Sequence, residues 1–239
     1  DYKIVSQVKE AQNMVGIIKG TDDELKNQFI VLSAHYDHEG IIDGEIYKGA
    51  DDNGSGTVAI LEAGRRLALL NDNRRSIVIV FHTGEEKGLL GSKYLTQQSD
   101  FMKNVVANIN IDMVGREDTE LLYSIGSGKL STELYELVER VNSETVKFEL
   151  DYTFDDPNDP NRYYYRSDHY NFAKQNIPIV FFYDHMTEDY HKPTDDVKKI
   201  NFEKIEKVST LITELALRIA NLDHKLILDI KEKENVDSR

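Results

Sequence analysis

Apolar and polar positions alternate in blocks along the chain, and the blocks predict strands and helices in turn. Residues 76–82 ("SIVIVFH") form a continuous apolar run that is typical of a strand buried on both faces of a parallel sheet. Residues 56–70 are apolar on most sides and predict a buried helix. A C-terminal helix should pack on the sheet through one apolar face, which consists of Phe202, Ile205, Val208, Leu211, Ile212, Leu215 and Ile219.

The remaining segments continue the alternation. Further strands are expected over 13–20, 28–37, 105–113, 120–126 and 177–184. Helices are expected over 88–98, 131–142 and 169–176, with Ser131 as the N-cap of the second. Residues 151–168 are rich in proline, acids and tyrosine and predict a long surface loop. Alternating strands and helices predict an α/β fold, a three-layer α/β/α sandwich around a mostly parallel, mixed central sheet.

The chain has neither a repeat nor a linker-like stretch, so residues 1–239 are interpreted as a single domain. It begins at Asp1 without a methionine and shows no signal peptide, and we therefore expect it to lack upstream N-terminal residues. No apolar run reaches the roughly 18 residues needed to span a membrane. The formal net charge of −14 argues against a nucleic-acid partner, because nucleic acids require a basic face.

The sequence contains no cysteine, which excludes disulfides, thiolate zinc sites and cysteine nucleophiles. It also lacks the His-Glu-x-x-His motif of one-zinc peptidase helices and the Gly-x-Ser-x-Gly elbow of serine hydrolases. Any metal in this protein must therefore be held by histidine, aspartate and glutamate side chains.

Acids and histidines follow the ends of several predicted strands. They are His35, Asp37, Asp51, Asp52, Glu85, Glu86, Asp112 and His191. A parallel sheet brings the carboxyl ends of its strands to one edge, where so many carboxylates would repel one another without a cation. One such residue alone is usually a satisfied structural group, but five segments together favour a divalent metal site. Mixed imidazole and carboxylate ligands suit zinc, cobalt or manganese better than calcium or magnesium.

Six motifs in order resemble those of the cocatalytic dizinc aminopeptidases, a family related to glutaminyl cyclases and to protease-like receptor domains. The motifs are "SAHYDHEG", "KGADDNGSGTVAILE", "FHTGEEKGLLGSKYL", "NIDMVG", "RSDHYNF" and "YHKPTDD". The resemblance covers about residues 13 to 220. It implies a zinc metallo-exopeptidase with two Zn²⁺ ions, for which Co²⁺ or Mn²⁺ could substitute.

The resemblance also implies a metal-binding role for five residues. In the family pattern, Asp51 bridges both ions. Glu86 and His191 complete one site. His35 and Asp112 complete the other.

Further roles follow from the same resemblance. Asp37 would accept the second N–H of a ligand imidazole, and Asp52 would support its loop through a cis Asp51–Asp52 peptide. Glu85 would be the general base for a water between the ions, on a turn that Gly84 permits. Two assignments concern the substrate. Tyr164 would donate to the oxyanion, with the register among 163–165 open by one, and Asp168 would orient the site or bind the substrate amine.

The implied activity is removal of the N-terminal residue from peptides with a free N-terminus, by an exported protein, periplasmic or secreted. A tyrosine-rich loop (152–165) and apolar Met113, Phe181 and Phe182 predict a pocket for a medium or large uncharged side chain. Histidines outside the ligand set are expected to be structural, close to the site without binding metal, or solvated; they are His38, His82, His169, His185 and His224.

Three alternative functions can be compared with that of an aminopeptidase. A glutaminyl cyclase uses one zinc and a tryptophan directly before the last histidine ligand, whereas this chain has Tyr190 there and no tryptophan at all. A non-catalytic receptor-type domain loses ligands, whereas every ligand position is filled here. A dipeptidase or carboxypeptidase variant remains open, because the metal motifs do not carry the discriminating side chains.

Overall fold

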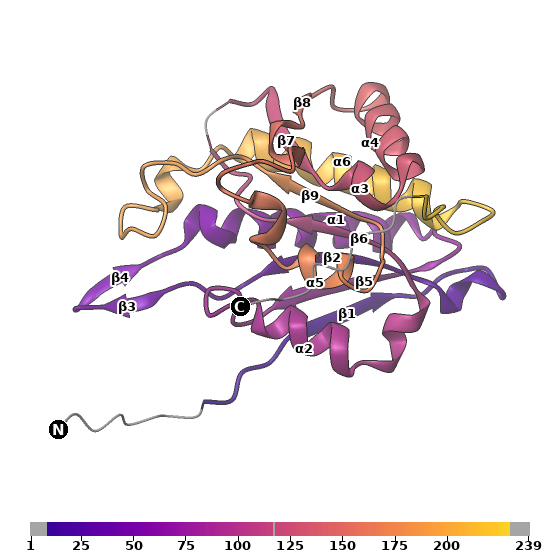
Figure 1. Cartoon of the computed structure of the whole chain (residues 1–239), viewed down its shortest axis with the longest axis horizontal. Coiled ribbons are helices and arrows are strands. Elements are labelled where there is room, and N and C mark those ends of the chain that lie inside the picture. The colour runs from indigo at the N-terminus through magenta and orange to yellow at the C-terminus, as the bar shows by residue number, and fades with distance from the viewer. Residues whose placement is uncertain (1–8, 117, 230–239) are drawn as a thin grey trace.

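The computed structural model describes residues 9–116 and 118–229, and its centre is a seven-stranded sheet (Figure 1). In spatial order the strands are β1 (Met14–Ile18), β5 (Ser76–His82), β2 (Phe29–His35), β6 (Val105–Ile111), β9 (Ile179–Tyr183), β7 (Leu121–Ile125) and β8 (Glu149–Asp151). The four central strands β5, β2, β6 and β9 run parallel, β1 and β7 pair antiparallel with β5 and β9, and β8 is parallel to β7. The prediction of a mostly parallel, mixed sheet is confirmed.

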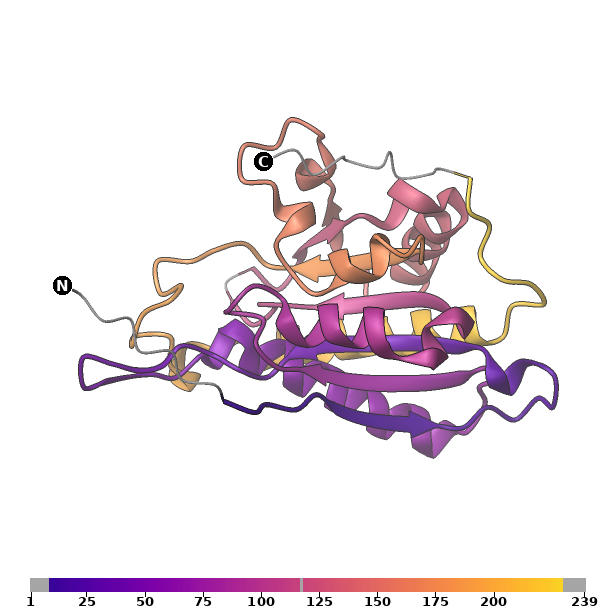
Figure 2. The same ribbon diagram turned by 60° about the horizontal axis from the view of Figure 1, so that its bottom comes forward.

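Helices cover both faces of this sheet (Figures 1 and 2). On one face lie α1 (Gly56–Leu70), α4 (Thr132–Glu144) and α6 (Phe202–Ala220), and on the other lie α2 (Leu90–Gln98), α3 (Ser127–Leu130) and α5 (His169–Ala173). A hydrophobic core lies on each face of the sheet, and successive residues of a strand point into opposite cores. Leu32 packs on the α6 side and Val31 on the α2 side. The predicted three-layer α/β/α sandwich is therefore present.

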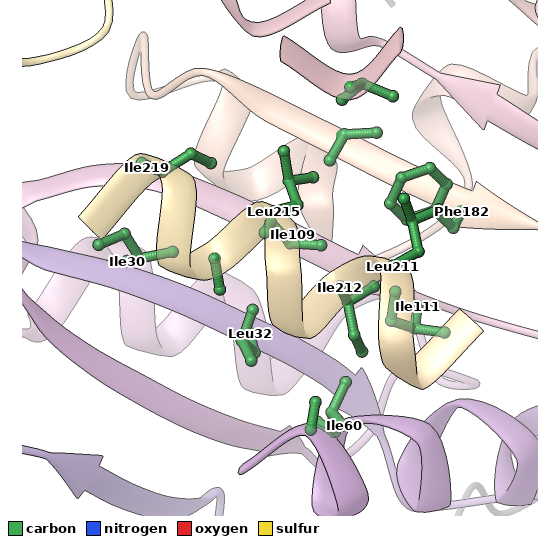
Figure 3. Close-up of a cluster of buried hydrophobic side chains, with 14 of the residues drawn as sticks. Ile30, Leu32, Ile60, Ile109, Ile111, Phe182, Leu211, Ile212, Leu215 and Ile219 are labelled. Carbon is green, nitrogen blue, oxygen red and sulfur yellow. The ribbon is translucent and has the colours of Figure 1, made fainter. Parts of the chain in front are cut away.

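The apolar face of α6 lies across the centre of the sheet. Figure 3 shows Leu211, Leu215 and Ile219 of this helix against Ile30 and Ile109 of the sheet. Phe202 is the exception to the predicted face: it is 61% exposed, because it is the first residue of the helix and precedes the part that packs on the sheet. At the start of α4, Ser131 Oγ accepts from Leu134 N at 3.2 Å, which confirms the predicted N-cap.

Some short elements were not predicted from the sequence. They are a hairpin formed by β3 (Gly40–Ile42) and β4 (Glu45–Tyr47), the helix α3, and β8, of which only Asp151 belongs to the segment predicted as loop. The hairpin turns at Asp43 and Gly44, both with positive φ (52° and 84°). An Asp-Gly pair between apolar residues is a typical hairpin sequence, so the signal was available.

The carboxyl ends of the parallel strands meet at one edge of the sheet. Here β2 and β5 end side by side, with His35 paired with His82 in the register. The hairpin after β2 and the segment after β9 lie at this same end of the molecule (Figures 1 and 2). Open α/β sheets bind ligands at such an edge. Separately, no helix among residues 9–116 and 118–229 combines the length and apolar composition needed to cross a bilayer.

Candidate metal centre

The carboxylate of Asp52 lies between two histidines. Its Oδ1 is 3.3 Å from His35 Nε2, and its Oδ2 is 3.2 Å from His191 Nε2. His35 Nε2 is also 3.3 Å from Asp112 Oδ1. His191 Nε2 is 3.0 Å from Glu86 Oε2. The five side chains thus form two groups of three that share Asp52.

The donor set and its spacing fit a pair of metal ions. Zinc bound by nitrogen and oxygen at about 2.0–2.2 Å has ligand atoms about 3.3–3.6 Å apart in a tetrahedral site. The separations of 3.0–3.3 Å between the histidine and carboxylate atoms are close to that value. Neutral imidazole and carboxylate are ligands that zinc accepts, and one carboxylate with an oxygen toward each histidine has the form of a bridging ligand.

The structure contradicts the assignment of Asp51 to the position between the histidines. Asp51 Oδ1 accepts from Gly115 N at 2.8 Å, and its Oδ2 is 3.7 Å from Arg116 Nε. Its side chain therefore contacts Gly115 and Arg116, and its neighbour Asp52 is the acid that lies between the two histidines. The cis peptide bond is likewise one residue later than predicted, between Asp52 and Asn53.

Electrostatics favour positive charge at both histidines. Burial lowers the pKa of His35, but Asp112, Asp37 and Asp52 outweigh it and hold that pKa well above the usual value. Hydrogen bonding to Asp52 and Glu86 raises the pKa of His191 to about 10. Because metal ions compete with protons for these nitrogens, the surrounding carboxylates favour a divalent cation in the same places.

The two adjacent glutamates lie in different environments. Burial is the main reason that the pKa of Glu85 rises to about 9, and nearby Asp112 and Asp168 raise it further. Burial also raises the pKa of Glu86, but hydrogen bonds to His191 and His38 outweigh it and lower that pKa overall. The turn before them is made at Gly84, whose φ of 66° favours glycine.

Side chains close to the cluster fix its members. The main-chain carbonyl oxygen of Asp37 is 3.0 Å from His35 Nδ1, whereas the Asp37 carboxylate is 3.7 Å away and accepts instead from Glu85 N at 3.2 Å. The expected contact between Asp37 and the imidazole is thus made mainly by the backbone. His38 lies near the cluster, where it was expected, with Nδ1 at 2.9 Å from Glu86 Oε1.

The structure contradicts the placement of Tyr164 at the site. Residues 163–165 form a 3₁₀ turn, in which consecutive side chains point about 120° apart. Tyr163 lines the cavity that holds the acid cluster, while Tyr164 lines a separate cavity beside Lys129. The sequence analysis missed Tyr190, which lines the first cavity and stacks on His191 at 3.9 Å between ring centroids.

The other candidates lie behind or beside the cavity. Asp168 is completely buried and does not line it, and its carboxylate oxygens have no hydrogen-bond partner among the residues described. His82 is also completely buried. His169 Nε2 is 2.8 Å from the carbonyl oxygen of Tyr164, and His185 stacks on Phe154.

Of the two phenylalanines predicted for the substrate pocket, Phe181 lines the cavity. Phe182 points instead into the core on the α6 side, contrary to expectation.

A buried carboxylate, Asp195, holds the loop that carries Asp52. It accepts from the main-chain N–H groups of Asp51 at 3.0 Å and of Asp52 at 3.1 Å. Arg116 Nη2 donates to Oδ1 of the same carboxylate, the oxygen that also accepts from Asp51 N. Because Asp195 comes four residues after His191, this contact fixes the loop of one candidate ligand to the segment that carries another.

A chain of buried hydrogen bonds ends on Asp112. Asn108 Nδ2 donates to Ser33 Oγ at 2.8 Å, and Ser33 Oγ donates to Asn110 Oδ1 at 2.7 Å. Asn110 Nδ2 then donates to Ser167 Oγ at 3.0 Å, and Ser167 Oγ donates to Asp112 Oδ2 at 2.7 Å. The chain leaves Asp112 Oδ1 directed at His35.

Comparison with known proteins agrees with this fold and cluster. The model of Peptidase family M28 matches residues 13–216, and the chain therefore belongs to this family, which is of the dizinc aminopeptidase type. The resemblance found in the sequence is confirmed.

Individual relatives are aminopeptidases by name. The chain is 28% identical to a probable leucine aminopeptidase of Trichophyton verrucosum, over 89% of this chain and 65% of that protein. It is 32% identical to aminopeptidase YwaD of Bacillus subtilis, over 85% and 43%. The solved structure of BSAP, a zinc aminopeptidase from Bacillus subtilis, superimposes with a TM-score of 0.70 at 26% identity, over 87% of this chain and 50% of that one. The chain thus spans less than two thirds of the length of these curated relatives.

Exchanging each acid of the Asp51–Asp52 pair separately tests which of them faces the metals. We expect Asp52→Asn to lower the zinc content of the dialysed protein by at least one ion per chain, because a neutral amide cannot bridge two cations. Asp51→Asn should keep its zinc and lower the thermal midpoint, since a buried arginine loses its charged neighbour. Elemental analysis and thermal denaturation measure the two effects, and the opposite pattern of zinc loss would restore Asp51 to the bridging position.

Asp195→Asn tests the anchor of this loop. We expect zinc affinity to fall about 10–100-fold, as is typical when a group that orients a metal ligand is lost. Asp196→Asn is the matched control, because Asp196 bonds Lys48 and Lys198 N at the surface, and it should change zinc affinity less than about twofold. Competition titration with a zinc chelator measures both, with near-UV circular dichroism as a check on folding. Equal affinities in a folded Asp195→Asn protein would contradict the anchoring role.

Proposed function

We propose that this chain is a metal-dependent aminopeptidase domain that releases the N-terminal residue of peptides with the help of two zinc ions. One ion would be held by His35, Asp52 and Asp112, and the other by Asp52, Glu86 and His191. The observation that carries the proposal is the Asp52 carboxylate, with one oxygen toward each histidine. The aminopeptidase relatives named above support the reaction class.

Glu85 is proposed as the general base. Two zinc ions in this place would polarise the substrate carbonyl and lower the pKa of a water molecule. Glu85 takes a proton from the attacking water as the water oxygen bonds to the carbonyl carbon, and gives that proton to the amide nitrogen as the C–N bond breaks. Its high pKa, caused mainly by burial, gives it the proton affinity for this role, and nearby cations would bring the pKa down toward neutral pH.

The remaining side chains of the cavity would position the substrate. Tyr190 is suited to donate to the carbonyl oxygen, since burial raises its pKa and keeps the phenol protonated. Met113 and Phe181 provide apolar wall for the released side chain. Asp112 and Glu85 are placed to attract the free α-ammonium group. Asp168 lies outside the cavity lining, so we assign it an orienting role behind Glu85.

Separate substitution of the two glutamates tests their division of labour. Glu85→Gln should keep its zinc and its fold while turnover falls by about 10²–10⁴-fold, the usual effect of losing a general base. Glu86→Gln should instead weaken zinc binding, since it removes a charged ligand. Zinc content by elemental analysis and rates on a leucyl anilide measure the difference. If both variants bind zinc equally well, the assignment of separate roles is wrong.

A panel of free and N-acetylated peptides tests the reaction itself. We expect leucyl, methionyl and aromatic substrates with a free amine to be cleaved. Acetylated forms should react at least about 10²-fold more slowly, because the acids that await the ammonium group stay unpaired. A chelator should abolish activity and added zinc should restore it. Comparable rates on blocked and free peptides, or indifference to the chelator, would contradict an aminopeptidase function.

A further inference from the structure

Arg166 is the only lysine or arginine among the described residues that line the cavity of the acid cluster. It directly precedes Ser167, whose hydroxyl donates to Asp112, so its backbone is anchored to the site. The residue is exposed, and solutes can reach it from solvent. The guanidinium is therefore an accessible positive charge on the wall of the proposed substrate site.

The neighbours of this guanidinium are neutral. Its Nη2 is 3.5 Å from the hydroxyl of Tyr190, its Nη1 is 4.0 Å from Met186 Sδ, and its Cζ is 5.3 Å from the ring centroid of Tyr163. Such contacts hold an arginine in place without neutralising it. Within the described residues, no carboxylate lies within ion-pair distance of Arg166.

Among the other described arginines, Arg65, Arg66, Arg74, Arg116 and Arg218 pair with carboxylates, whereas Arg75, Arg140 and Arg162 do not. Arg116 pairs with Asp195, and Arg65 donates to both oxygens of Glu62. With 43 acids and 29 basic residues in the chain, partners are abundant. An arginine carries five N–H donors in a rigid fork that matches the two oxygens of a carboxylate. At Arg166 most of these donors remain available on the cavity side.

We propose that Arg166 binds a carboxylate of the substrate. The inference rests on the proposed function, because it takes this cavity as the substrate site. Four carboxylates line the cavity, namely Asp52, Glu85, Glu86 and Asp112, and two divalent ions would balance them. An anionic group is then not repelled, and the guanidinium, which pairs with no carboxylate among the described residues, can bind it through charge-assisted hydrogen bonds.

Two parts of a peptide could supply this carboxylate. One is the side chain of an N-terminal aspartate or glutamate, which would make the enzyme tolerant of acidic residues. The other is the C-terminal carboxylate of a dipeptide, which would favour very short substrates. Both present the same chemical group to Arg166, and matched ligands separate them.

Binding to the zinc-loaded Glu85→Gln protein, in which turnover is expected to be slow, tests the proposal. Two ligand pairs, each differing by a carboxylate against an amide, are titrated calorimetrically: L-glutamate against L-glutamine, and leucyl-glycine against leucyl-glycinamide. In at least one pair the acid should bind about 10-fold or more tightly than the amide, as expected for a charge-assisted hydrogen bond. The pair that shows the preference identifies the source of the carboxylate.

Substitutions then assign the preference to one side chain. Arg166→Met, which keeps an apolar stem, should abolish the preference for the acid, and Arg166→Lys should retain part of it. Arg162→Met is the matched control: Arg162 lies over the Tyr165 ring at 4.7 Å on the same turn but lines the other cavity, so the preference should persist. Absence of any acid preference in the parent protein, or its survival in Arg166→Met, overturns the proposal. Because this experiment measures binding and not hydrolysis, a failure of peptide hydrolysis in the unmodified enzyme would bear on the proposed function alone.

Discussion

The candidate metal centre depends on one buried interaction, the contact of the Asp195 carboxylate with two successive main-chain N–H groups. Through it, the loop at residues 50–55 takes the orientation that turns Asp52 toward the histidines and Asp51 toward Arg116. Arg116 pairs with the same carboxylate, so the charge of Asp195 is compensated where water is excluded. Loss of one member of such a set leaves an unpaired buried charge, which costs a protein about 3–5 kcal/mol.

A second buried pair continues this arrangement beneath the site. Lys204 of α6 is fully buried and donates to Asp184, which follows β9. Asp184 also accepts from the main-chain N–H of Arg116 at 2.8 Å. The helix that covers the centre of the sheet is thereby connected to the residues that hold the metal loop. Core packing and buried charge pairs thus meet at Arg116, whose main-chain N–H binds Asp184 and whose side chain binds Asp195.

Much of the fold could be predicted from the sequence, because its periodic signals are local. The apolar run of β5 and the apolar face of α6 each specify an element without reference to the rest of the chain. The same local signals place the acids and histidines at one edge of the sheet. The directions in which Asp51 and Asp52 point are not local information. They depend on Asp195, which is 144 residues away from Asp51 in the sequence. No local pattern contains that information.

For the tyrosines and for Arg166, too, the sequence does not reveal where the side chains point or what they contact. A 3₁₀ turn sends Tyr163 and Tyr164 to different cavities, and a shift of one residue in that turn would reverse them. The composition of residues 151–168 predicts a surface loop and does not tell to which side each tyrosine points. The sequence around Arg166 does not indicate a binding role. The proposal for this residue depends on the neutral side chains that the structure places around its guanidinium.

The hydrogen-bonded chain from Asn108 to Asp112 has a direction. Every link donates toward the carboxylate, so the dipoles of two amides and two hydroxyls align head to tail with their positive ends toward Asp112. Aligned links polarise one another, and the sheet interior thereby acts as a fixed electric field on one carboxylate oxygen. The field favours the ionised carboxylate, and it begins at Asn108, the fourth residue of β6, which is completely shielded from solvent.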